Sequence, residues 1–297
     1  PGLTPVGSIL DTYDLFVTVT NTNNGGEALP MQKLITLDTT KDYSLTNLGN
    51  TFTSKADLQT AVDLWTSDNV TALSSYGEIN TWDVSLITDM SELFSGKTTF
   101  NDNISAWDVD NVTNMENLFQ EAHSFNKDIS NWNVSKVTSM GYMFSDATSV
   151  NPDISNWAVG NVTDMSYMFG EATSFNQDIS GWDVSSVTDM GGMFYYASNF
   201  NQNLNNWNVS NVTDMALMFE NADVFNQDIS NWDVSNVTTM YKMFQGADDF
   251  NQDISGWNVS SVTNMVYMFM LSAFNQDLND WNVSSVTNMS NMFRDAN

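Results

Sequence analysis

The stretch FNQDISGWDVSSVTDMGGMFYYASN, from Phe175 to Asn199, decides the fold because the chain repeats it. Nine copies fill residues 76–297. The tryptophan of the copy recurs every 25 residues, with one interval of 24 before the last: Trp82, Trp107, Trp132, Trp157, Trp182, Trp207, Trp232, Trp257 and Trp281. A fixed period of this length indicates a repeat protein, in which each unit buries its apolar face against the next unit. We therefore expect the tryptophans to form a structural ladder in the interior.

The order of apolar residues within one copy predicts a short strand followed by a short helical turn. Ile179, Trp182 and Val184 are spaced so that the last two face the same side of an extended segment. The apolar residues later in the copy are separated by three positions or by one position in the sequence, which suits an α- or 3₁₀-helical turn. Thr188 is placed to cap the start of that turn. Met190 and its equivalents in the other copies are expected to fill the core, because their spacing matches the apolar face.

The pattern FNQDISxWDVSxVTDMxxMFxxAxx resembles the repeat of about 25 residues found in bacterial surface proteins, which is grouped with BspA-like leucine-rich repeat proteins. Its IxxWxV segment takes the place of the LxxLxL strand of leucine-rich repeats. The resemblance implies an α/β repeat solenoid that is leucine-rich-repeat-like, with one short strand and one short helical turn per coil. It implies no catalytic chemistry. It also implies an extracellular location at a cell surface, or alternatively a virion, because some phage and marine-virus proteins carry the repeat.

A helical cap is predicted over residues 51–75, directly before the nine coils of residues 76–297. Leu58, Ala61, Val62 and Trp65 lie on one face of an amphipathic helix, which Ser54 can cap. Stacked repeats need such a cap, because the first coil would otherwise expose its apolar interior.

Residues 1–50 are predicted to form a small β-rich attachment module. The segments Asp14–Asn21 and Met31–Thr40 have strand composition, and the glycine pair Gly25-Gly26 between them indicates a hairpin turn. No secretory signal precedes Pro1, so either a signal was removed or Pro1 follows an initiator methionine. At the other end, either the natural chain continues past Asn297 or the last coil meets another molecule.

The composition narrows the classes of function. Eight Lys and Arg against 36 Asp and Glu give a net charge of −28, which excludes nucleic acid as a partner and disfavours anionic membranes. No apolar run is long enough for membrane insertion. The chain has no cysteine, and His123 is its one histidine, which argues against thiolate metal sites and histidine-based catalysis. The sequence therefore predicts a binding or structural protein with no cofactor, rather than an enzyme.

Aspartates four residues before the tryptophan are the candidate metal ligands. Stacked carboxylates repel, and Ca²⁺ between the coils would offset that repulsion. The alternative is that each aspartate caps a turn of its own backbone, which the absence of a glycine-rich calcium-binding nonapeptide favours. The candidates are Asp128, Asp153, Asp178, Asp228 and Asp253.

Tyrosines on the expected helical side are the candidate binding residues: Tyr142, Tyr167, Tyr241 and Tyr267. Aromatic side chains among small polar residues suit contact with a glycan or a protein, although the same rings can simply pack along the coil. We therefore expect a non-enzymatic, surface-displayed recognition or adhesion solenoid that binds a host protein, a glycan or a neighbouring subunit. The alternative is a structural virion protein, such as a phage fibre or tail component, anchored through its N-terminal module.

Overall fold

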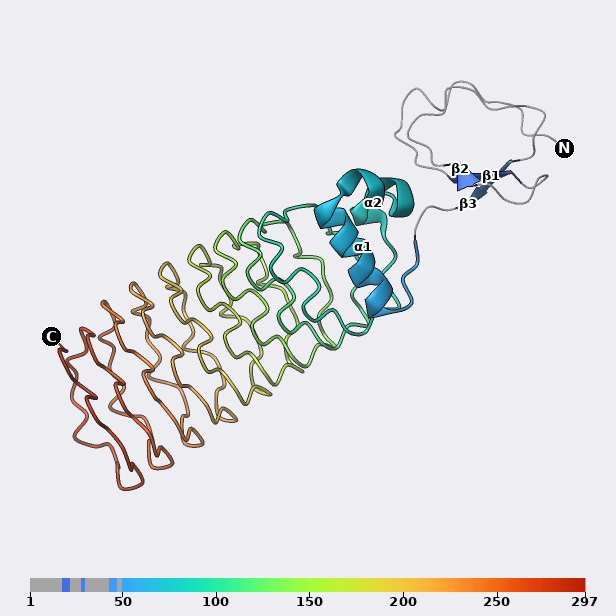
Figure 1. Cartoon of the computed structure of the whole chain (residues 1–297). Coiled ribbons are helices and arrows are strands. Elements are labelled where there is room, and N and C mark those ends of the chain that lie inside the picture. The colour runs from blue at the N-terminus through green and yellow to red at the C-terminus, as the bar shows by residue number, and fades with distance from the viewer. Residues whose placement is uncertain (1–17, 22–27, 30–42, 47–49, 297) are drawn as a thin grey trace. The chain divides into compact units, whose positions relative to one another are not determined.

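The computed structural model describes residues 18–21, 28–29, 43–46 and 50–296. The chain forms two compact units, Pro1–Leu86 and Ile87–Asn297. Figure 1 shows the helices α1 and α2 in the first unit and a series of similar loops in the second. No helix among the described residues is long and apolar enough to cross a membrane.

A small antiparallel sheet lies in the first unit. Its strands are β1 (Thr18–Asn21), β2 (Ala28–Leu29) and β3 (Tyr43–Thr46), in the order β2-β1-β3. β1 lies within the first predicted strand segment and pairs with β2, with Val19 opposite Leu29. The second predicted segment, Met31–Thr40, and the glycine pair of the predicted turn lie outside the described residues. The sequence did not indicate β3, which pairs with the other edge of β1.

The predicted amphipathic helix is present, although it is shorter than expected. Helix α1 spans Lys55–Ser67, α2 spans Asn69–Tyr76, and the 3₁₀ turn η1 spans Ile79–Thr81. The hydroxyl oxygen of Ser54 accepts the N–H of Asp57 at 3.2 Å, which confirms the predicted cap. The four residues predicted to face the core are all buried in α1. Asp68 separates the two helices because its carboxylate accepts the N–H of Thr71 and caps α2.

Aromatic rings hold these helices on the first repeat tryptophan within the same unit. The ring of Trp82 lies 5.2 Å from that of Phe52, 5.8 Å from that of Trp65 and 5.8 Å from that of Tyr76, measured between centroids. A parallel bridge between Thr51 and Asp83 joins the segment before α1 to the same repeat. The α1 face thus covers Trp82, which is the arrangement that a helical cap requires.

The second unit consists of repeats joined by hydrogen bonds between residues one repeat apart. We number positions within a repeat from its tryptophan, so that position +7 lies seven residues after it. Parallel bridges link position +7 of each repeat to the same position of the next, from Asp89 to Asn288. At positions +8, +10, +12 and +14 the backbone N–H donates to a carbonyl of the following repeat. In the repeat of Trp182 these donors are Met190, Gly192, Phe194 and Tyr196, at 2.7–3.1 Å.

The remaining N–H groups of this segment close tight turns, so the expected helical turn is absent. In the repeat of Trp182, the N–H of Met193 donates to the carbonyl of Met190, and that of Tyr195 to Gly192. The backbone therefore alternates between right- and left-handed conformations, and positions +10 and +14 have positive φ in every repeat. We call the surface formed by positions +9, +10, +13 and +14 the turn face; positions +11 and +12 face the interior.

The expected strand is absent as well, because turns use its hydrogen-bonding groups. The N–H of Trp182 donates to the carbonyl of Ile179 at 3.1 Å, and that of Val187 to Val184 at 3.0 Å. The described residues after Leu86 contain bridges and turns but no extended strand and no helix. Thr188 does not cap a turn either: its N–H and its hydroxyl both donate to the carbonyl of Thr163 in the preceding repeat.

The interior contains continuous columns of stacked side chains. Phe194 stacks between Phe169 and Phe219 at 5.9 and 5.5 Å, and against Phe200 at 4.0 Å, with interplanar angles near 10°. All nine repeat tryptophans are at most 8% exposed. From Trp132 onward, each indole N–H donates to a carbonyl of the preceding repeat at 2.9–3.3 Å. The methionines at position +8 are fully buried except Met289, so they fill the core.

Candidate functional site

The five candidate metal ligands each complete a turn of their own backbone. Their Oδ1 atoms accept the N–H of the residue two positions later, a serine in each case, at 2.9–3.0 Å. The hydroxyl and then the N–H of that serine hold the pKa of Asp128, Asp153, Asp178 and Asp253 below the usual value. The turn interpretation therefore accounts for these aspartates. Within the described ranges, no group of three His, Asp or Glu residues could hold a metal ion.

A second row of carboxylates was not singled out from the sequence. Asp164, Asp189 and Asp214 occupy position +7 of three successive repeats and are joined by the parallel bridges. Asp189 lies between the other two. Its burial, and then the charges of Asp214 and Asp164, raise the pKa of Asp189 in spite of the hydrogen bond that it accepts from the Gly191 N–H. This row therefore concentrates unfavourable charge at one place in the stack.

Replacing Asp189 by asparagine should stabilise the protein by about 0.5–1 kcal/mol at pH 7, because like charges one strand spacing apart cost energy. Asn114, Asn264 and Asn288 already occupy the same position in other repeats, where their Oδ1 atoms accept the equivalent N–H. Since the folded-state pKa of Asp189 is raised, its stabilising contribution exists only at low pH and is lost as the pH rises through that pKa. The advantage of the variant should therefore disappear below about pH 4. Urea denaturation at pH 7 and pH 3.5 measures it.

The matched control is Asp178→Asn, at a position that Asn103 and Asn203 fill in other repeats. The pKa of Asp178 is lowered by Ser180, so its carboxylate stabilises the fold at neutral pH and loses that effect as the pH falls. The control should leave stability at pH 7 unchanged or slightly lower. An equal increase in the free energy of unfolding in Asp189→Asn and Asp178→Asn would show that repulsion within the row does not cause the stabilisation.

The candidate tyrosines lie on the turn face, and two of them touch. Tyr142 and Tyr167 occupy position +10 of successive repeats and stack at 4.8 Å with an interplanar angle of 10°. Tyr241 and Tyr267 form a separate edge-to-face pair at 6.4 Å. All four are partly exposed. The structure thus divides the four candidates into two groups rather than one surface.

Two further tyrosines, which the sequence analysis did not select, extend the first group. Tyr195 packs edge-on against Tyr167 at 5.7 Å and against Tyr196 at 4.5 Å. Gly192 makes this contact possible, because a Cβ at that residue would lie 2.5 Å from the Tyr167 ring. Burial and the charges around it raise the pKa of Tyr167 to about 12. We call Tyr142, Tyr167, Tyr195 and Tyr196 the tyrosine strip.

A buried ion pair follows the tyrosine strip on the turn face. The side chain of Glu220 is 4% exposed, and its Oε1 accepts hydrogen bonds from the Lys242 ammonium and the Gln245 amide, each at 3.0 Å. Its Oε2 has no partner among the described residues. Burial raises the pKa of Glu220, and Lys242 offsets only part of that effect. Burial alone would lower the pKa of Lys242, but the hydrogen bond and charge of Glu220 raise it overall.

The sequence did carry a signal for this pair. Position +13 holds an acidic residue in one repeat alone, and position +10 holds a basic residue in one repeat alone. These two breaks of the pattern, Glu220 and Lys242, fall in adjacent repeats. A comparison of each position down the nine copies would have found both.

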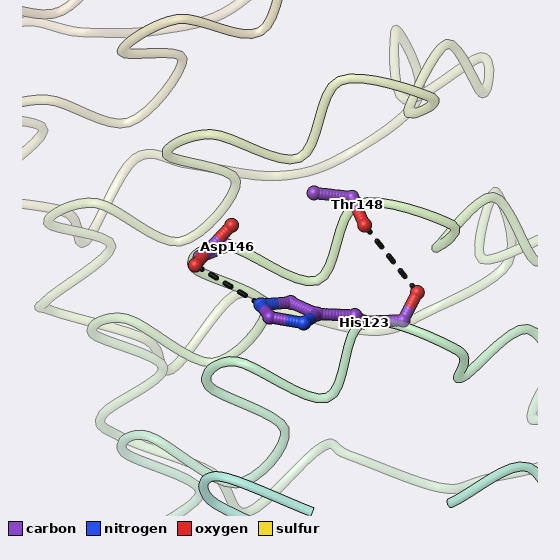
Figure 2. A network of polar contacts seen from close by, with 3 residues as sticks. All are labelled: His123, Asp146 and Thr148. Atoms are coloured by element: carbon purple, nitrogen blue, oxygen red, sulfur yellow. Dashed lines mark hydrogen bonds and ion pairs between the residues drawn. The ribbon is translucent and has the colours of Figure 1, made fainter. Parts of the chain in front are cut away.

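The single histidine also pairs across a repeat boundary (Figure 2). His123 Nε2 lies 3.1 Å from Asp146 Oδ2, and the hydroxyl of Thr148 donates to the His123 carbonyl at 3.4 Å. The side chains of His123 and Asp146 are 43% and 38% exposed, so this contact stabilises the fold by less than about 1 kcal/mol. It is one more link between neighbouring repeats.

Nine copies of one unit, joined position by position through hydrogen bonds, define a tandem-repeat protein. The chain belongs to the family described as "Mycoplasma protein of unknown function, DUF285", whose model matches residues 74–177, 148–248 and 202–297. The three matches overlap and together span the repeats. No curated protein and no solved structure matches the chain.

Proposed function

We propose that this protein is a non-enzymatic recognition solenoid, displayed outside the cell, whose turn face binds a protein or glycan on another surface or a neighbouring subunit. The leucine-rich-repeat-like class and the extracellular location rest on the resemblance of the repeat to the BspA-like surface-protein unit. The hydrogen-bonded stacking of successive repeats supports the solenoid class.

The observation that carries the proposal is the contrast between constant and variable positions within this one chain. Positions +2, +8 and +12 hold valine, methionine and phenylalanine in all nine repeats. Position +13, on the turn face, holds seven different residue types: Ser95, Gln120, Ser145, Gly170, Tyr195, Glu220, Gln245, Met270 and Arg294. Packing explains the constant positions, because each side chain must fit its copies in the neighbouring repeats. Variation beside such regularity is typical of a surface used for specific contacts.

A variant of the four tyrosines predicted from the sequence tests this function. Tyr142, Tyr167 and Tyr267 would become asparagine, which Asn117 and Asn291 already supply at position +10. Tyr241 would become serine, which Ser91 and Ser166 supply at position +9. Beads coated with the wild-type chain should bind saturably to at least one member of a glycan array or a panel of cell-surface proteins. The folded variant should lose that binding.

The control replaces residues away from the turn face, Asp153→Asn and Asp178→Asn, which lie in the turns before the tryptophan. Circular dichroism and urea denaturation verify that both proteins fold. Equal binding by the wild type and the tyrosine variant would contradict a role for the turn face, as would the absence of any saturable binding by the wild type.

A further inference from the structure

The tyrosine strip is a continuous aromatic surface across three successive repeats. Its rings contact one another in order, from Tyr142 through Tyr167 and Tyr195 to Tyr196, with centroid distances of 4.8, 5.7 and 4.5 Å. Tyr196 is 44% exposed, and the other three are partly exposed. Ring contacts of this kind fix the side chains before any ligand arrives, so little conformational entropy is lost on binding.

The electrostatic surroundings of the strip are anionic. Carboxylates act on the phenols of Tyr142, Tyr167 and Tyr195, and after burial their charges raise the pKa values of these three tyrosines. The carboxylates are Glu116, Asp164, Asp189, Glu171, Asp214 and Glu220. One cation, Lys242, also interacts with the phenol of Tyr196, and its ammonium is paired with Glu220. A positively charged ligand would therefore be favoured at this surface, and a neutral one would gain nothing from the field.

Glu220, next to the tyrosine strip, has a hydrogen-bond acceptor atom that no residue of the described chain uses. It occupies position +13 directly after Tyr195, one repeat further along the stack. Its side chain is 4% exposed, yet Oε2 has no hydrogen-bond partner in the described part of the chain. An unpaired buried acceptor is costly, and a charged donor that reached it would recover that cost.

We propose that the tyrosine strip binds an arginine-containing, cationic segment of a partner protein. A guanidinium group is planar, weakly hydrated and able to stack on an aromatic face while its N–H groups bind carboxylates. An ammonium group lacks the planar face. The inference names the partner of the proposed recognition surface and rests on that proposed function.

Peptide binding to the full chain tests the inference. The probes are acetyl-(Gly-Arg)5-amide, acetyl-(Gly-Lys)5-amide and the neutral sugar cellohexaose, with affinity measured by titration calorimetry at 150 mM salt. The arginine peptide should bind, and more tightly than the lysine peptide. The variant Tyr195→Ser with Tyr196→Asn should lose about tenfold in affinity, since two ring contacts are removed. Ser95, Ser145 and Asn221 occupy the same positions in other repeats, so the backbone accepts these residues.

The matched control separates the strip from the general negative charge of the chain. Tyr267→Asn removes a turn-face tyrosine outside the strip and leaves the net charge unchanged, so it should keep wild-type affinity. NMR of the wild-type protein with ¹³C-labelled tyrosine gives a second measurement that needs no strip variant. The arginine peptide should change the chemical shifts of the strip tyrosines and leave that of Tyr267 unchanged.

Several outcomes would overturn the inference. The first is an equal loss of peptide affinity in the strip and control variants. The second is equal affinity of the wild type for the two peptides, and the third is a chemical-shift change spread over all tyrosines. If cellohexaose binds and the strip variant abolishes its binding, the strip is a glycan site; the cationic partner is then wrong while the recognition function stands. If none of the three probes binds, the cationic partner is wrong; if the panel assay also fails, the recognition function is contradicted as well.

Discussion

Lys242→Met should destabilise the protein by about 3 kcal/mol at pH 7, because it leaves the buried carboxylate of Glu220 without a cation. The Lys242 side chain is 24% exposed and that of Glu220 is 4% exposed, so the carboxylate bears most of the desolvation cost. Gln245 would still donate to Oε1, while Oε2 would remain unpaired. Urea denaturation followed by tryptophan fluorescence and circular dichroism measures the loss.

The pH dependence of the stability loss, and a second substitution at Glu220, show whether Lys242→Met destabilises the protein through the lost charge or through lost packing. Without Lys242 the folded-state pKa of Glu220 should rise further, so stability is present at low pH and is lost as the pH rises through that value. The Lys242→Met deficit should therefore shrink on acidification. The double variant Glu220→Met with Lys242→Met should recover most of the stability at pH 7, because an apolar pair replaces the ion pair. A double variant as unstable as the single one would contradict this account.

Trp207→Ala should cost about 3–5 kcal/mol, the range for removing a large buried aromatic side chain. Trp207 is 3% exposed, and its indole N–H donates to the Ile179 carbonyl at 3.1 Å. The substitution therefore leaves a cavity and removes one of the two hydrogen bonds that the Ile179 carbonyl accepts, the other coming from the Trp182 N–H. Because repeats stabilise one another only through their neighbours, the loss should also divide the unfolding transition into two steps.

Trp207→Phe is the control for this prediction. It keeps an aromatic ring in the column and removes the N–H donor, so it should cost about 1 kcal/mol, because the Ile179 carbonyl loses one of its two hydrogen bonds. Hydrogen exchange should then show faster opening around Ile179 than around Met265. A single sharp transition in Trp207→Ala, with stability close to that of the wild type, would contradict the importance of the tryptophan column.

The sequence predicted the repeat and its buried residues, because a 25-residue period and the apolar positions are visible directly. It also predicted the apolar face of α1 and the hydroxyl of Ser54 that caps it, since these follow from local spacing. The local conformation within the repeat was predicted wrongly. Apolar steps of three and one suit a helix, but they suit consecutive tight turns equally well, and only the hydrogen bonds to the next repeat distinguish the two.

The candidate site was predicted only in part for a related reason. Tyr142 and Tyr167 were selected because they are aromatic, yet their contact with Tyr195 depends on the missing side chain of Gly192. The pairing of Glu220 with Lys242 crosses from position +13 of one repeat to position +10 of the next. Such contacts depend on how the repeats align in space, which the period alone does not specify.

The hydrogen bonds along the turn face give the stack a polarity. At positions +8, +10, +12 and +14 each repeat directs N–H groups toward its successor, and its carbonyls at neighbouring positions receive those of its predecessor. Along the turn face, one edge of a repeat is therefore a row of donors, and the opposite edge is a row of acceptors. Two stacks can join head to tail through these rows, whereas a head-to-head meeting would place donors against donors. Any assembly built through these edges must be directional, like a filament that grows by adding units in one orientation.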